Sequence, residues 1–292
     1  MSTRPGDLHY SYYPGCSLHA TGLEYDTSVR AVFAALGVTL EELDEWNCCG
    51  ASSAHALSHN LAIGLPARNL SLIEKRGLEA MAPCAACFNR LRAAQEAVRE
   101  TPDAYGWLSS VLDTPLRGDA VVHSPIGVLV KVIGLESVGR HVVRPLNGLK
   151  AVSYYGCLLA RPRAVSELSS SDHPAELDDL WRVLGGEPVM WSYAVDCCGG
   201  ALSIPRADIA RSMTQTIVDA ARAAGADLIL TACPLCQANL EMRQKLTKNG
   251  PPMPALYFTE AMGLAFGLPD APGWWGKHLI DPRPLLREVN LT

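Results

Sequence analysis

The sequence predicts an α/β fold of two homologous domains, each a largely parallel sheet flanked by helices. Three observations lead to this prediction. The chain has 292 residues, which suits one large domain or two of about 150 residues each. Its ten cysteines form two sets of five with one repeated spacing. Strand-like segments also alternate along the chain with segments whose apolar residues recur at helical spacing, and this order is typical of parallel sheets.

The two cysteine sets share one order: a single cysteine, a doublet followed by glycine, and a C-x-x-C pair. The first set is Cys16, Cys48, Cys49, Cys84 and Cys87, and the second is Cys157, Cys197, Cys198, Cys233 and Cys236. In both sets 34 residues separate the doublet from the C-x-x-C pair, whereas the gap before the doublet is 31 residues in the first set and 39 in the second. The repeat predicts a duplication, with an N-terminal domain at 1–148 and a C-terminal domain at 149–292.

The expected elements lead into the cysteines in both copies. Strands are expected before each cysteine motif, at 8–16, 38–46, 78–83, 149–157, 187–196 and 226–232. Helices are expected at 23–37, at 55–77 with a bend at Pro66, at 204–225, and after each C-x-x-C pair. Because ligands gather at the carboxyl ends of parallel strands, we expect each cysteine set to assemble at that edge of its sheet.

Composition and charge narrow the class of protein. Hydrophobic residues make up 48% of the chain and charged residues 19%, as in an ordinary globular protein. The net charge is -5 and no block of Lys or Arg occurs, which disfavours nucleic-acid binding. The N-terminus lacks the apolar core of a signal peptide, and no apolar run is long enough to span a membrane. We therefore expect a cytoplasmic protein, in which cysteines bind metal more often than they form disulfides.

The number of thiols in each set constrains the kind of metal centre. A tetrahedral zinc and a cubane four-iron cluster each take four ligands, whereas each set supplies five thiols. Adjacent sulfurs can reach two different irons of an extended cluster, and the glycine after the doublet permits a positive φ beside a bulky core. The pattern favours a non-cubane iron–sulfur cluster. Mixed iron–sulfur and zinc sites, zinc alone, and a dithiol pair rank below it, because dithiol chemistry leaves three cysteines of each set unexplained.

These motifs resemble a known family. The pattern C-x31–39-CCG-x33-CxxC occurs twice, together with "YYGCLLARP", "APCAACFNRL", "LPARNL" and "VVRPLNGLK". It resembles the cysteine-rich CCG domain of the heterodisulfide reductase B subunit and of its sulfur-oxidising relatives. The resemblance implies one non-cubane four-iron four-sulfur cluster for each set of five cysteines, with zinc in one site as the alternative. It also implies an oxidoreductase subunit that cleaves or forms a disulfide or persulfide, the cluster itself attacking the disulfide.

The chain lacks the motifs of other electron carriers. It contains no C-x2-C-x2-C-x3-C run, no GxGxxG after a strand and no P-loop. Electrons are therefore expected to pass to or from a separate subunit. The resemblance implies a ferredoxin-like iron–sulfur C subunit and a flavin-containing A subunit as partners, with a disulfide or persulfide substrate that a carrier protein could hold. The substrate and the direction of the reaction are not fixed by the sequence.

Two rival functions stay open. The first is an iron–sulfur electron-transfer subunit of a membrane-associated dehydrogenase, passing electrons from a flavin subunit to quinone. Exposure of the segment "TEAMGLAFGL" at 259–268 would favour this hypothesis, although a buried position is the better expectation. The second is a zinc-stabilised scaffold without redox activity.

Histidines near the cysteines are secondary candidates. His55 and His59 are expected on one helix at i, i+4 spacing, where they could give a proton to a thiolate product. A structural role is the commoner one for such histidines, and the same holds for His19, three residues after Cys16. His123 lies in an apolar stretch and is expected in the core.

Three arginines and two tryptophans also lie near the cysteines. Arg161, Arg163 and Arg206 could bind an anionic substrate tail, although an ion-paired or solvated position is the commoner role for any one of them. Trp46 and Trp191 precede the doublets and are expected to pack around the centres and shield them from water.

Overall fold

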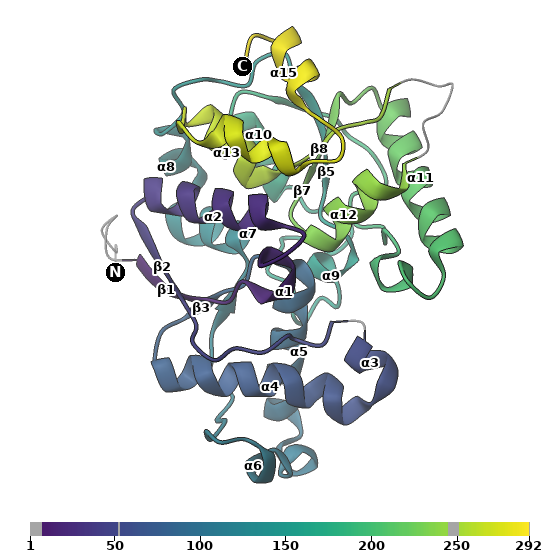
Figure 1. Ribbon diagram of the computed structural model, residues 1–292. Coiled ribbons are helices and arrows are strands. Elements are labelled where there is room, and N and C mark those ends of the chain that lie inside the picture. Colours follow the sequence, from purple (N-terminus) through teal and green to yellow (C-terminus); the bar gives the residue numbers. More distant parts are fainter. Residues whose placement is uncertain (1–7, 52, 245–250, 292) are drawn as a thin grey trace.

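A computed structural model describes residues 8–51, 53–244 and 251–291. It contains two four-stranded sheets with equivalent strand orders, β2-β1-β3-β4 and β6-β5-β7-β8. Every strand pair in both sheets is parallel. Helices flank both sheets (Figure 1). The predicted α/β class with two equivalent domains is confirmed.

The strands are short, and six of the eight lead into a cysteine motif. The first sheet consists of β1 (Leu8–Tyr12), β2 (Val38–Glu42), β3 (Ala80–Met81) and β4 (Val122–His123). The second consists of β5 (Lys150–Tyr154), β6 (Glu187–Pro188), β7 (Leu228–Thr231) and β8 (Ala255–Tyr257). All six expected strands are present, and β4 and β8 were not expected. A short apolar run fits a buried helix as well as a strand, which hid β8 within a segment that becomes helical at Phe258.

The helices of the two halves follow the same plan. The first half contains α1 (Gly15–Leu18), α2 (Leu23–Ala35), α3 (Ser53–Leu57), α4 (His59–Arg76), α5 (Ala85–Glu100), η1 (Pro102–Tyr105), α6 (Leu108–Val111), α7 (Pro125–Gly127), η2 (Val128–Ile133) and α8 (Leu135–Gly139). The second contains α9 (Cys157–Ala160), α10 (Glu176–Val183), η3 (Gly200–Leu202), α11 (Ala207–Ala223), α12 (Pro234–Arg243), α13 (Phe258–Ala265), α14 (Ala271–Trp274), η4 (Trp275–Lys277) and α15 (Arg283–Glu288).

The single helix expected at 55–77 is wrong, because the chain forms two helices there. Ser58 has an extended backbone, with φ -161° and ψ 135°, and its side chain accepts a hydrogen bond from the Leu61 amide. Serine favours this N-cap position, so α4 restarts at His59 after α3 has ended. Pro66 lies inside α4, and the helix ends at Gly77 in the left-handed region, as its glycine predicts.

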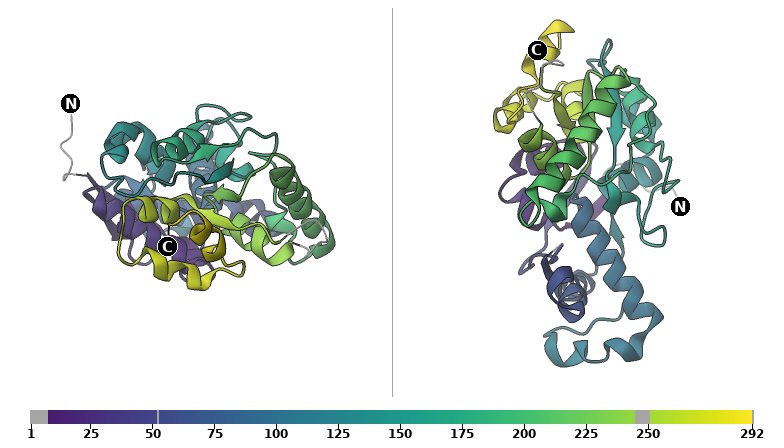
Figure 2. Two further views of the ribbon diagram at one scale, coloured as in Figure 1. Left: turned by 90° about the horizontal axis from the view of Figure 1, so that it is seen from above. Right: turned by 90° about the vertical axis from the view of Figure 1, so that its right-hand side faces the viewer.

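Helix α13 of the second half packs against α2 of the first (Figures 1 and 2). The Tyr25 and Tyr257 rings stack with centroids 4.2 Å apart and an interplanar angle of 3°. The hydroxyls of Ser28 and Thr259 lie 2.7 Å apart in the same interface. Every residue of α13 is buried, so the segment "TEAMGLAFGL" belongs mainly to the core.

A second helix contact joins the two halves: α8 of the first half packs against α10 of the second. The Glu167 carboxylate of the second half accepts hydrogen bonds from the Ser124 amide of the first at 2.7 Å and from the Ser124 hydroxyl at 2.9 Å. The Asn89 amide on α5 donates to the carbonyls of Leu158 and Arg161 at 2.9 and 2.8 Å. The two halves therefore share one core. The boundary near residue 148 falls between β4 and β5 and stays a prediction.

A buried ionic cluster holds the C-terminal segment. The His278 side chain is 1% exposed and lies 2.7 Å from Glu241 on α12 and 2.9 Å from Glu260 on α13. Burial alone would lower the pKa of His278, but the charges and hydrogen bonds of the two glutamates outweigh it and raise the pKa to about 10. The His278 side chain is therefore cationic at neutral pH.

Among the helices that the structure describes, none combines the length and the apolar character that a membrane span requires.

Candidate metal centres

The cysteines lie where the strands of each sheet end. Cys16 lies in α1 directly after β1, and Cys84 is the N-cap of α5 after β3. In the second half Cys157 begins α9 after β5, and Cys233 is the N-cap of α12 after β7. The expected assembly at the carboxyl edge of each sheet is observed.

A tyrosine fixes the approach to each doublet. The Tyr13 hydroxyl donates to the carbonyl of Asn47, the residue before the first doublet, at 2.7 Å. The Tyr154 hydroxyl donates to the carbonyl of Asp196, before the second doublet, at the same distance. The tyrosines of "YYPGC" and "YYGC" thus tie the first cysteine of each set to its doublet. Asn69 adds to this in the first half, because its side-chain amide donates to the Asn47 carbonyl at 2.9 Å.

Each set has an outer pair and a buried trio. The cysteines with exposed or half-buried side chains are Cys16 and Cys48 in the first set and Cys157 and Cys197 in the second. The buried cysteines are Cys49, Cys84, Cys87, Cys198, Cys233 and Cys236. None of the ten forms a disulfide.

The sulfurs meet in the same pairs in both halves. The Cys16 and Cys48 sulfurs lie 3.6 Å apart, and those of Cys49 and Cys87 lie 3.3 Å apart. In the second half the sulfurs of Cys198 and Cys236 are separated by 3.5 Å. Across residues 8–51, 53–244 and 251–291, no three His, Cys, Asp or Glu side chains converge as a site for one metal ion.

In the outer pair of each half, the pKa is lowered at the same position, which is the first cysteine of the doublet. A hydrogen bond from the Cys157 thiol lowers the pKa of Cys197 to about 6, and the Gly199 amide also donates to its sulfur at 3.3 Å. A hydrogen bond from Cys16 likewise lowers the pKa of Cys48 well below that of a free thiol. The first cysteine of each doublet is therefore the one that ionises more readily, and the thiolate is the form that binds metal.

The two sets meet at their C-x-x-C pairs. The buried thiols of Cys84 and Cys233 interact across the two halves: the interaction with Cys233 raises the pKa of Cys84, and the interactions with Cys236 and Cys84 lower the pKa of Cys233. The Tyr25 hydroxyl lies between the residues that precede them, 3.3 Å from the Pro83 carbonyl and 3.2 Å from the Ala232 carbonyl. The two candidate centres are thus neighbours.

Glycines leave room for the sulfurs. Gly15 has φ +71° and Gly156 has φ +68°, and a Cβ on either would lie 2.6 Å from the Cys87 sulfur or 2.8 Å from the Cys236 sulfur. The glycines after the doublets, Gly50 and Gly199, have φ +79° and +77°, as the sequence predicts. Paired thiols, polarised thiolates and an open backbone fit a multinuclear inorganic group.

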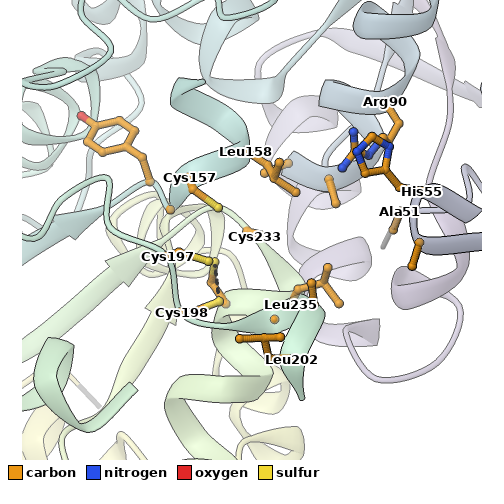
Figure 3. A pocket seen from close by; sticks show the side chains of 18 of the residues that line it. Ala51, His55, Arg90, Cys157, Leu158, Cys197, Cys198, Leu202, Cys233 and Leu235 are labelled. Carbon is orange, nitrogen blue, oxygen red and sulfur yellow. Dashed lines mark hydrogen bonds between the residues drawn. The ribbon is translucent and has the colours of Figure 1, made fainter. Parts of the chain in front are cut away.

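A cavity of about 440 Å³ opens onto the second set (Figure 3). All five cysteines of that set line it. The opposite wall comes from the first half and includes Ala51 after the first doublet, His55 and Ala56 on α3, and Ala85, Ala86 and Arg90 on α5. Most of the remaining wall is apolar, with Leu158, Leu202, Pro205 and Leu235 among its residues.

The structure separates the histidine candidates. His55 on α3 lines the cavity, whereas His59 begins α4 and lies 3.3 Å from the Tyr105 hydroxyl, so the expected pairing on one helix is wrong. His19 is exposed and lies 3.1 Å from the Glu42 carboxylate. His123 is half-buried rather than in the core, because it reaches the Glu79 and Glu167 carboxylates at the sheet edge.

The arginine and tryptophan candidates have other contacts. Arg161 pairs with Asp172 at 2.8 Å, Arg206 pairs with Asp208 at 2.9 Å, and Arg163 donates to the Leu168 carbonyl. None of them lines the cavity. Trp46 packs edge-on against Tyr13, and Trp191 donates to the Ser153 carbonyl at 2.9 Å, so both are packing residues.

Sequence reasoning missed Arg90, the one arginine among the described residues that line the cavity. It lies in "APCAACFNRL", and its counterpart 149 residues later in "TACPLCQANL" is Asn239. Aligning the two copies position by position would have exposed this difference.

Comparison with known proteins agrees with the repeat. The cysteine-rich domain family called CCG matches residues 10–92 and 151–241. The chain belongs to the CCG cysteine-rich domain family. Its two CCG domains contain all ten cysteines, and each domain includes one sheet's strands up to the C-x-x-C helix.

Relatives of this CCG chain are redox subunits. The 8-methylmenaquinol:fumarate reductase membrane anchor subunit of Wolinella succinogenes is 31% identical over 281 residues, 94% of this chain and 98% of the relative. A protein of Archaeoglobus profundus, named as similar to the heterodisulfide reductase B subunit, is 27% identical, covering 89% and 91% of the two chains. The B subunit of the ferredoxin:CoB-CoM heterodisulfide reductase of Methanosarcina mazei is 26% identical, covering 90% and 91%. These names support the oxidoreductase and iron–sulfur themes of the sequence.

Comparison with solved structures supports the fold. A hypothetical protein from Helicobacter pylori matches with a TM-score of 0.71 and 12% identity over 96% of this chain. The chain spans 53% of that protein, and the likeness shows the fold alone.

Proposed function

We propose that the chain is the catalytic iron–sulfur subunit of a heterodisulfide-reductase-like complex, cleaving or forming a disulfide or persulfide at its second cysteine set. One observation carries the proposal: a cavity with a largely apolar wall reaches all five cysteines of that set. The first set lies behind it, joined through Cys84 and Cys233, and serves as the second redox centre. Each set would bind one four-iron four-sulfur cluster, of the non-cubane type.

The reaction in the reductive direction breaks the S–S bond of RSSR′, consumes two electrons and two protons, and releases RSH and R′SH. Iron–sulfur centres, when bound, supply one-electron steps. The chain's own residues hold the centres, exclude water and position the substrate. The apolar wall of Leu158, Leu202 and Leu235 excludes water from the sulfurs. His55 faces both the cavity and solvent, so its imidazole can pass protons to a product thiolate.

The donor set fits an extended cluster better than one zinc ion. Each half supplies five thiols, of which two pairs are in contact in the first half and one pair in the second, and Gly15 and Gly156 leave space against the sulfurs. Anaerobically purified protein should contain about eight irons and eight acid-labile sulfides per chain. About four irons with one zinc would support a mixed pair of sites, and zinc without sulfide would defeat the proposal.

Substitution of single ligands tests the assignment of the ten cysteines. Cys198→Ser should remove or convert the electron paramagnetic resonance (EPR) signal of the second centre and abolish disulfide reduction with reduced methyl viologen. Cys49→Ser should do the same to the first centre. An unchanged spectrum in either variant would show that the substituted cysteine is not a ligand.

The partners follow from the proposal. A ferredoxin-like C subunit and a flavin-containing A subunit would deliver the electrons, in a complex located in the cytoplasm. Co-purification of the natively expressed, affinity-tagged chain with subunits that contain flavin and cubane clusters is the expected result. Isolation of the chain alone, active with a physiological donor, would contradict it.

A second candidate function is electron transfer between a flavin subunit and quinone in a membrane-associated dehydrogenase. The 31% identity to a fumarate reductase membrane anchor subunit favours it. The burial of α13 does not, because the amphipathic segment that could face a bilayer belongs to the core. Reduction of a soluble menaquinone analogue without reduction of any small disulfide would select this function over the first.

A further inference from the structure

Arg90 has an unusual environment for an arginine. Its Nε atom is buried without a hydrogen-bond partner. No hydrogen bond or ion pair joins its guanidinium to another residue in the described parts of the chain. Arg92, two residues along the same helix, is engaged instead, donating to the Val122 carbonyl at 3.2 Å and lying 3.9 Å from Glu167. A buried donor without a partner is costly, so Arg90 is prepared for a group that the chain does not supply.

The cavity around Arg90 suits an anion. His55 is the only other lining residue, among those described, with a basic side chain, and none of the described lining residues has a carboxylate. Both come from the first half. Figure 3 shows Arg90 and His55 on one side of the cavity and Cys157, Cys197 and Cys198 on the other. The cavity therefore has a cationic end and a sulfur end, with an apolar wall between them.

The duplication shows that the fold does not require an arginine at this position. Asn239, the equivalent residue of the second half, is fully engaged: its side-chain amide donates to the Cys198 carbonyl at 2.9 Å, and its side-chain oxygen lies 2.8 Å from the Ser203 hydroxyl. His55 likewise corresponds to the apolar Ile204. Two positions that are neutral in one copy are basic in the other, and both basic residues line the same cavity.

We propose that Arg90 binds the anionic end of the substrate, which is a small organic thiol or disulfide with a carboxylate, sulfonate or phosphate group. The proposal deepens the proposed function and rests on it for the sulfur chemistry. The planar guanidinium can take such a group with two parallel hydrogen bonds. The opposite end of the same molecule then faces Cys157 and Cys197. Arg90 is thus a specificity-determining residue.

The activity test compares two disulfides that differ in charge. Bis(2-carboxyethyl) disulfide is anionic and bis(2-hydroxyethyl) disulfide is neutral, and reduced methyl viologen supplies electrons to the iron-loaded protein. The wild type should favour the anionic disulfide in kcat/KM. Arg90→Gln should reduce this preference about ten- to hundredfold, mainly through KM. Arg90→Lys should restore part of it, because lysine keeps the charge but not the paired hydrogen bonds. Arg99→Gln, an exposed arginine on the same helix, should behave as wild type.

A binding test separates this inference from the proposed function. The anionic thiol 3-mercaptopropionate should perturb the EPR signal of the second centre in the wild type, with little effect in Arg90→Gln, whereas 2-mercaptoethanol should bind both alike. If neither disulfide is reduced but this contrast holds, the proposed function fails and the anion site stands. If wild type and Arg90→Gln reduce the disulfides with the same preference between anionic and neutral, and 3-mercaptopropionate perturbs the EPR signal equally in both proteins, the anion site fails and the function stands.

One outcome would assign Arg90 a different role. If Arg90→Gln shifts the reduction potential of the second centre and leaves KM for both disulfides unchanged, the guanidinium balances the charge of the centre, and the inference is overturned. Iron content and thermal unfolding of Arg90→Gln equal to wild type would confirm that the variant folds.

Discussion

The glycine beneath the second centre allows a stringent test of how the chain holds its metal. Gly156 has φ +68°, and a Cβ there would lie 2.8 Å from the Cys236 sulfur. Ordinary contact begins near 3.4 Å, so Gly156→Ala forces the sulfur to withdraw by about 0.6 Å, well beyond the roughly 0.2 Å by which metal–ligand distances vary. The substitution also places alanine in the left-handed region, which costs about 1 kcal/mol.

Gly77→Ala is the matched control, because Gly77 has φ +73° and a Cβ there would meet nothing within 4 Å. Both variants should lose about 1 kcal/mol, near 2 °C in Tm, through the backbone alone. Only Gly156→Ala should also lose the second centre, falling from about eight irons per chain to about four. Iron and sulfide analysis with EPR spectroscopy measures this. Full iron content and an unaltered spectrum in Gly156→Ala would refute the proposed position of Cys236 as a ligand.

Three further predictions concern buried contacts. His278→Gln should lower the free energy of unfolding by about 3–5 kcal/mol near pH 6. Because the folded pKa of about 10 exceeds the unfolded value of 6.5, the stabilisation is complete below pH 6.5 and is lost as the pH rises through 10; a difference from wild type that grows with pH would contradict this. Cys233→Ser should perturb the EPR signals of both centres, whereas Cys236→Ser should perturb the second alone; equal, single-centre effects would place the two sets apart. Tyr25→Phe should cost about 1 kcal/mol in denaturant unfolding by removing one buried hydroxyl, and an unchanged midpoint would show that its two carbonyl contacts contribute nothing.

The features that the sequence predicts are those encoded locally. The cysteine spacing, the strands before each motif and the glycines with positive φ all depend on a few neighbouring residues, and the structure has them where they were expected. The break at Ser58 was also encoded locally, by a serine that caps better than it continues a helix. It was missed because the apolar spacing continues through it.

Other features depend on packing between distant segments. Strands β4 and β8 are two and three residues long, and no cysteine motif follows them to mark their position, as one does for the equally short β3 and β6. The meeting of Cys84 with Cys233 depends on how the two halves dock, which no spacing within either half encodes. Arg90 differs from its counterpart Asn239 in the sequence, but its place in the cavity and its buried, unpartnered Nε depend on the fold. The assignment of the ten cysteines as ligands stays a prediction until metal is measured.

The tyrosine between the two C-x-x-C loops restricts motion. Opening the molecule like a clamshell would unstack Tyr25 from Tyr257 and withdraw its hydroxyl from both the Pro83 and Ala232 carbonyls. Both C-x-x-C loops would lose their contact with Tyr25 in the same movement. The contacts of Tyr25 therefore oppose a separation of the two halves, whereas a small molecule that enters the cavity through its existing opening reaches Cys157 without breaking any of them.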